Sequence, residues 1–240
     1  AEGYINTTAD GASLLLTGYE IQVPYSTALP ITSSSVIPRT IAVVNASGNI
    51  SSSFALNDFA DGGSPRSVAS IDGTSFWLAG STGGLRYALP GATTSTLISN
   101  TVLNLRTAAI YDGILYVSSG SGSVVRLGSL GAGLPTTGDQ VITNLPGFPT
   151  TGSPYAFFMA DLNATIAGVD TLFVADDVTG ISKYSLVSGP FGLSWTLNGT
   201  FTTTGSAYRG LTGYVNGTNV TLFATRNGGS MAVGGGDLVK

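Results

Sequence analysis

The sequence contains no cysteine and no histidine, and these two absences exclude much of enzyme chemistry. Without them the chain has no Ser-His-Asp triad, no Cys-His dyad, no histidine-ligated zinc and no histidine general acid or base. Carboxylate chemistry, lysine or tyrosine bases, and hard metals with oxygen ligands remain open. The lack of cysteine gives no information on the redox compartment.

Charge is also scarce, at 9% of residues with a net charge of −4. The basic residues do not cluster, so the chain has no basic stripe for a phosphate backbone, and we expect no nucleic-acid partner. Apolar runs such as residues 155–159 are far shorter than the roughly 18–20 residues of a membrane span. We therefore expect no membrane insertion by this chain.

Glycine and the small polar residues are abundant instead. The chain has 34 glycines and 10 prolines, together with many serines and threonines, but only two methionines. This composition indicates many turns between short strands and predicts an all-β fold.

A repeat supports that prediction. An apolar stretch, an Asp-Gly or Asn-Gly turn, a stronger apolar strand, a Gly/Ser turn and a strand with one basic residue recur along the chain. The turns begin at Asp10, Asp72, Asp112, Asp170 and Asn216. Their spacing fits a unit of about 40–45 residues with insertions in two copies, which is the period of a β-propeller blade. Both residues of an Asp-Gly hairpin turn are expected at positive φ.

The sequence therefore predicts a single β-propeller domain over residues 1–240, with four strands in each blade. Five blades are visible, at about 1–58, 62–101, 102–148, 149–203 and 204–240. The last blade ends within its third strand, so we expect the protein to continue beyond Lys240 or another chain to complete the blade. A complete ring of six or seven blades is favoured over five.

Four segments carry a family resemblance: Ala9–Tyr19, Gly147–Pro149, Thr171–Asp177 and Tyr208–Gly213. With them, nearly the whole chain resembles a group of uncharacterised secreted propeller-like proteins, many of them bacterial and ending in a PEP-CTERM-type surface-sorting signal. This sequence stops before any such signal. The resemblance implies a propeller fold and an export route, but no activity. Separately, Leu172–Tyr184 is similar to a strand pair of NHL-type propellers.

Arginines form the first candidate ligand site. Arg66, Arg106 and Arg209 stand at the entry to a blade's first strand, where the fourth blade has Tyr155. First strands line a propeller's central channel, so these positions would face one axis and could bind a carboxylate, a sulfate or an acidic sugar. In the alternative, which we favour, each arginine bonds backbone carbonyls or an acid of a neighbouring blade.

Carboxylates supply the second set of candidates. Asp61, Asp161 and Asp176 are acids that the hairpin turns do not obviously use, and a glycosidase needs two carboxyl groups about 5–10 Å apart. Asp176 and Asp177 together are also candidate calcium ligands, and calcium is the only cofactor that the sequence suggests. The alternative is a turn whose aspartates cap backbone amides.

Seven Asn-x-Ser/Thr motifs predict N-glycosylation, against about three expected by chance from the acceptor rule. Glycans would supply solvation that the scarce charge does not, although a bacterial chain could carry the motifs unmodified. The seven asparagines are Asn6, Asn45, Asn49, Asn163, Asn198, Asn216 and Asn219.

We interpret the sequence as a non-enzymatic extracellular or cell-surface propeller, glycosylated, that acts as a scaffold or binding module. Its expected partners are other copies of the chain, extracellular proteins or glycans. The rival hypothesis is a carboxylate-based hydrolase or lyase acting on a glycan or lactone at the channel. Fold alone does not separate the two.

Overall fold

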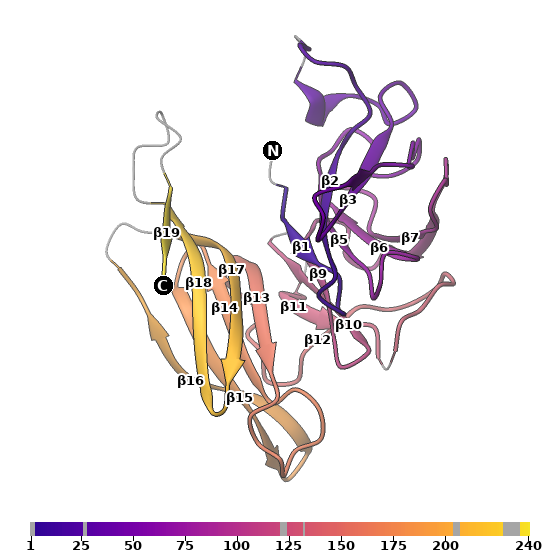
Figure 1. Cartoon of the computed structure of the whole chain (residues 1–240). Helices are drawn as coiled ribbons and strands as arrows, with labels where there is room; N and C mark the ends of the chain where they lie inside the picture. The colour runs from indigo at the N-terminus through magenta and orange to yellow at the C-terminus, as the bar shows by residue number, and fades with distance from the viewer. Residues whose placement is uncertain (1–2, 26–27, 121–123, 132, 204–206, 228–235) are drawn as a thin grey trace. The chain divides into compact units, whose positions relative to one another are not determined.

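The computed structural model describes residues 3–25, 28–120, 124–131, 133–203, 207–227 and 236–240, which consist mainly of β-strands and loops (Figure 1). The helical content of these residues is a single 3₁₀ turn, η1 (Leu29–Ile31). Within the described ranges, no helix has the length and apolarity that a membrane crossing requires.

Strands that follow one another in the chain pair with one another, giving four four-stranded sheets and one three-stranded sheet. The first sheet contains β1 (Asn6–Thr7), β2 (Ser13–Tyr19), β3 (Arg39–Asn45) and β4 (Ile50–Ser51). The second contains β5 (Pro65–Ala69), β6 (Phe76–Gly80), β7 (Leu85–Ala88) and β8 (Thr96–Ser99). The third contains β9 (Leu105–Tyr111), β10 (Ile114–Ser119), β11 (Leu127–Ser129) and β12 (Thr143–Asn144). The fourth contains β13 (Pro154–Ala160), β14 (Thr171–Asp176), β15 (Gly180–Gly189) and β16 (Gly192–Phe201). The last contains β17 (Ala207–Asn216), β18 (Asn219–Asn227) and β19 (Asp237–Val239).

Sheets of this kind are the blades of a propeller, and the predicted all-β β-propeller fold class is confirmed. The chain divides into two compact units, residues 1–117 with 129–143, and residues 118–128 with 144–240. The single domain, the blade bounds and a ring of six or seven blades stay predictions.

In the second and third sheets, the second strand is the most buried element. All five residues of β6 are buried, and so are the last five of the six residues of β10. Strands covered on both faces read as continuous apolar runs, which is why these segments stand out in the sequence. In the first unit, Leu15, Ile41, Val68, Phe76 and Leu78 form one core cluster. Packing between sheets therefore accounts for these apolar side chains.

The turn prediction is correct for glycine but wrong for most of the preceding residues. Only the Asp112-Gly113 turn has both residues at positive φ, 49° and 68°. The Asp10 and Asp72 turns keep the aspartate at negative φ because its carboxylate bonds forward instead. Asp72 Oδ1 accepts from the amide of Thr74 at 3.0 Å and from its hydroxyl at 2.7 Å. These are Asx turns, in which the side chain replaces a backbone hydrogen bond.

Candidate functional site

A β-bulge recurs near the start of the first strand in three sheets. Each bulge contains one residue of the predicted ligand set: Arg66 in β5, Tyr155 in β13 and Arg209 in β17. A bulge adds one residue to the strand and redirects its side chain. The positions that the repeat places in equivalence thus share one local irregularity.

Arg209 and Tyr155 are brought together in the second unit. The Arg209 guanidinium lies over the Tyr155 ring, 4.7 Å from its centroid, and binds the Asp177 carboxylate through two hydrogen bonds of 2.9 Å. The Arg209 side chain is 44% exposed, while Tyr155 is buried. An acidic ligand at Arg209 would compete with Asp177, so the arrangement is a paired cation that joins β17 to the β14–β15 turn.

Arg66 makes a comparable link in the first unit. Its Nη1 donates to Asn104 Oδ1 at 2.6 Å and to the carbonyl of Leu105 at 3.1 Å, at the entry to β9. Arg106 follows as the second residue of β9 and is half-buried. Both arginines contribute to the first unit, whereas Arg209 and Tyr155 belong to the second. A shared ligand for all four residues stays a prediction.

The predicted calcium ligand Asp176 caps backbone amides. Its Oδ2 accepts from the amide of Ser153 at 2.7 Å, and its Oδ1 accepts from the amides of Val178 at 2.7 Å and Thr179 at 3.0 Å. With Asp177 bound to Arg209, both carboxylates already have protein donors. Among the described residues, no three or more acidic side chains gather into a metal-binding group.

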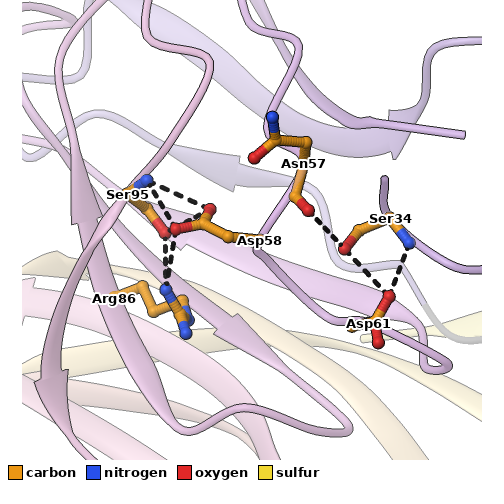
Figure 2. A network of polar contacts seen from close by, with 6 residues as sticks. All are labelled: Ser34, Asn57, Asp58, Asp61, Arg86 and Ser95. Carbon is orange, nitrogen blue, oxygen red and sulfur yellow. Dashed lines mark hydrogen bonds and ion pairs between the residues drawn. The ribbon is translucent and has the colours of Figure 1, made fainter. Parts of the chain in front are cut away.

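Asp61 is held in the same way by a serine turn (Figure 2). Its Oδ1 accepts from the amide of Ser34 at 2.7 Å, from Ser33 Oγ at 2.9 Å and from Ser34 Oγ at 3.0 Å. These donors hold the pKa of the Asp61 carboxyl below its usual value, the Ser34 amide most strongly. A carboxylate stabilised in its charged form is a poor general acid.

Nearby Asp58 forms an ion pair that the sequence did not reveal. Asp58 Oδ2 lies 3.1 Å from Arg86 Nη1, and Ser95 donates to the same carboxylate from its amide at 3.0 Å and its hydroxyl at 2.9 Å. Figure 2 shows this group beside the Asp61 turn. These contacts connect the loop before β5, which carries Asp58, to β7 and to the residue before β8 in the second sheet.

Asp161, the third carboxylate of the hydrolase hypothesis, is exposed and directly follows β13. The buried Asp170 lies at the other end of the same loop, and its Oδ2 accepts from the amides of Leu162 at 2.9 Å and Asn163 at 2.7 Å. Burial raises the pKa of Asp170, but hydrogen bonds from Thr171 and from the amides of Asn163 and Leu162 outweigh burial and lower it. Asp170 therefore holds the loop after β13 in place.

Arg39 is a buried cation that sequence reasoning missed. It is fully buried, and its guanidinium donates to the carbonyls of Thr32, Ile37, Ala60 and Gly63. Burial lowers the pKa of this guanidinium. The sequence carries one sign of this buried arginine: Arg39 is the only charged residue between Glu20 and Asp58.

Six of the seven glycosylation candidates are exposed, all except Asn6. The Asn6 amide nitrogen, the atom that an N-glycan would occupy, donates to Ser67 Oγ at 3.0 Å, to the Val68 carbonyl at 2.8 Å and to the Ala108 carbonyl at 2.9 Å. Asn6 thus joins β1 to the first strands of the next two sheets. The nitrogen that a glycan would occupy in this motif therefore makes hydrogen bonds that connect three strands.

No protein-family model matches the chain, and no curated protein matches its sequence. Solved structures share the fold. One is a protein of unknown function from Bacteroides thetaiotaomicron, with a TM-score of 0.52, 14% identity, and coverage of 81% of this chain and 47% of that one. Another is the periplasmic gluconolactonase of Pseudomonas aeruginosa, with a TM-score of 0.53, 13% identity, and coverage of 99% and 71%. The chain spans about half the length of the Bacteroides protein. Identities this low show the shared fold alone.

Proposed function

We propose that the protein is a secreted, non-catalytic propeller that carries N-linked glycans and binds extracellular proteins or glycans. The observation that carries the proposal is a division among the polar side chains. Asp61 and Asp176, two of the three candidate catalytic acids, accept hydrogen bonds from local donors. Six acceptor asparagines, in contrast, are exposed on loops, hairpin ends and outer strands.

The carboxylates supply the argument against catalysis. A two-carboxylate enzyme keeps one group protonated through a raised pKa, so that this group can donate its proton. In Asp10, Asp61, Asp72 and Asp170 the pKa is lowered by hydrogen bonds. Such groups stabilise turns and remain charged at neutral pH.

Secretion is supported by the family resemblance and by the glycosylation motifs. The likeness to a periplasmic gluconolactonase is one of fold at 13% identity, so lactone hydrolysis enters here as the outcome that contradicts the proposal.

The test uses protein purified from its native cells. Intact mass is measured before and after peptide N-glycosidase, followed by peptide mapping of the seven motifs and by binding to an array of glycans. We expect a loss of mass and modified peptides at exposed asparagines, with Asn6 unmodified. An unmodified protein that binds nothing would refute the proposal. So would gluconolactone hydrolysis that Asp61→Asn abolishes.

A further inference from the structure

The outer strand of the fourth sheet differs from the outer strands of the other four-stranded sheets. β4 and β12 have two residues each and β8 has four, whereas β16 has ten. Figure 1 shows β16 as a long strand at the margin of its sheet. Short outer strands are one way in which proteins keep sheet edges from pairing with other chains. β16 does not use this protection.

The chemistry of β16 also lacks the usual protection. No charged residue occurs between Lys183 and Arg209, and no proline occurs within the strand. Leu193, Leu197 and Phe201 are 48%, 52% and 61% exposed. Among the described strands, β15 is the one that pairs with β16, which is the last strand of its sheet. The Trp195 amide donates to the Pro146 carbonyl at 2.8 Å, so a loop covers the edge there, and the edge considered below is that of residues 196–201. A long, uncharged and apolar edge of this kind invites pairing with a second chain.

One irregularity interrupts the edge, and it lies at a glycosylation motif. Tyr184 pairs with Leu197 and Lys183 with Gly199, so Asn198 is the extra residue of a bulge. Asn198 is exposed, and its Oδ1 accepts a 2.8 Å hydrogen bond from Ser185 Oγ. This contact holds the amide through its oxygen, while a glycan would attach to the nitrogen.

We propose that an N-glycan on Asn198 covers the β16 edge and prevents it from pairing with β16 of a second copy. This inference rests on the proposed function, because it requires the protein to be glycosylated. A bulky, hydrated sugar in the middle of the strand supplies the steric and solvating barrier that charge supplies on other edges. Residues 196–201, which lie beyond the Trp195–Pro146 hydrogen bond, carry no charge that would repel a second copy, so without the sugar this part of the edge can pair with its counterpart.

The experiment compares variants secreted from a eukaryotic host that attaches N-glycans. Thr200→Ala removes the motif and keeps the Asn198 side chain, whereas Thr200→Ser keeps the motif. Asn163→Gln, which removes an exposed motif from a loop, is the control for losing any one glycan. Size-exclusion chromatography with light scattering gives the mass of each protein, and the emission of buried Trp195 reports whether β16 is folded.

We expect wild type, Thr200→Ser and Asn163→Gln to be monomeric, and folded Thr200→Ala to show at least a twofold higher protein mass. Adding Leu197→Lys to Thr200→Ala should restore the monomer. Asn198→Gln repeats the comparison if Thr200→Ala disturbs the strand. A folded, glycan-free variant that stays monomeric overturns this inference alone. Wild type without sugar at Asn198 overturns it as well, and native protein without any glycan contradicts the proposed function.

Discussion

Replacing Arg39 tests whether a buried cation organises the loops around β3. The guanidinium reaches Thr32 and Ile37 in the segment before the strand, and Ala60 and Gly63 in the segment before β5. Its acceptors are these four backbone carbonyls and the hydroxyl of Thr32, at 3.2 Å. In Arg39→Ala these carbonyls lose the group that holds the two segments together.

The size of the effect follows from what each carbonyl retains. The Ala60 carbonyl keeps the amide of Gly63 at 3.0 Å, and the Thr32 carbonyl keeps the amide of Gly62 at 3.2 Å. The other two carbonyls lose their guanidinium donor, at about 1–3 kcal/mol for each buried group left unsatisfied. Removing the buried charge returns some desolvation energy, and the vacated space removes some packing. We therefore expect Arg39→Ala to lower the free energy of unfolding by about 3–5 kcal/mol.

The chain offers a separate reporter for each unit, since Trp77 is buried in the first and Trp195 in the second. Urea unfolding is followed by Trp77 emission in a Trp195→Phe background. With an m value of about 3 kcal/mol/M, the midpoint should fall by about 1–1.7 M urea. Arg39→Lys should lose most of the same stability because one ammonium cannot reach all four carbonyls. Exposed Glu20→Ala is the control. An Arg39→Ala midpoint within about 0.3 M of wild type would refute the reasoning, since that shift corresponds to about 1 kcal/mol.

Three further predictions test other polar contacts. Asn6→Ala should destabilise the first unit by about 2–3 kcal/mol, because three hydrogen bonds are lost. The exposed Asn49→Ala should change stability by less than about 0.5 kcal/mol, and Trp77 emission in urea measures both. The folded-state pKa of Asp170 lies below its unfolded value, so its contribution is present above about pH 4 and lost as pH falls below that. Asp170→Asn should make the second unit less stable at neutral pH and flatten this acid dependence, measured by urea unfolding from pH 3 to 7. Arg209→Lys should cost at most about 1 kcal/mol, because the Arg209–Asp177 pair is partly exposed, and a loss above 2 kcal/mol on Trp195 emission would contradict that estimate.

The sequence predicts the repeat well because a blade is a local unit. The four strands expected in each blade are observed in the second sheet, at Pro65–Ala69, Phe76–Gly80, Leu85–Ala88 and Thr96–Ser99. Turn residues and apolar periodicity fix such elements within a few positions. The same alignment placed Arg66, Tyr155 and Arg209 in equivalent positions. It did not predict their bulges, since one extra residue lies within the tolerance of the spacing.

Partners of the polar residues were harder to predict because they lie far away in the sequence. Asn6 bonds across 102 residues to Ala108, and Asp58 across 28 residues to Arg86. A sequence motif reports the residues beside an asparagine, while burial depends on strands that arrive later in the chain. For this reason the seven motifs look alike in the sequence, but the structure separates Asn6 from the other six.

Burial of the strands and the need to satisfy backbone amides at the turns together determine which side chains remain exposed. Because second strands such as β6 are covered on both faces, polar residues concentrate at strand ends, turns and outer strands. At the turns, backbone amides need acceptors, and the nearby aspartates supply them, as Asp176 does. Outer strands have no such demand on their side chains, so an exposed residue such as Asn198 keeps its amide nitrogen available for modification. In this chain, therefore, turn aspartates such as Asp176 accept from backbone amides, while six of the seven acceptor asparagines are exposed.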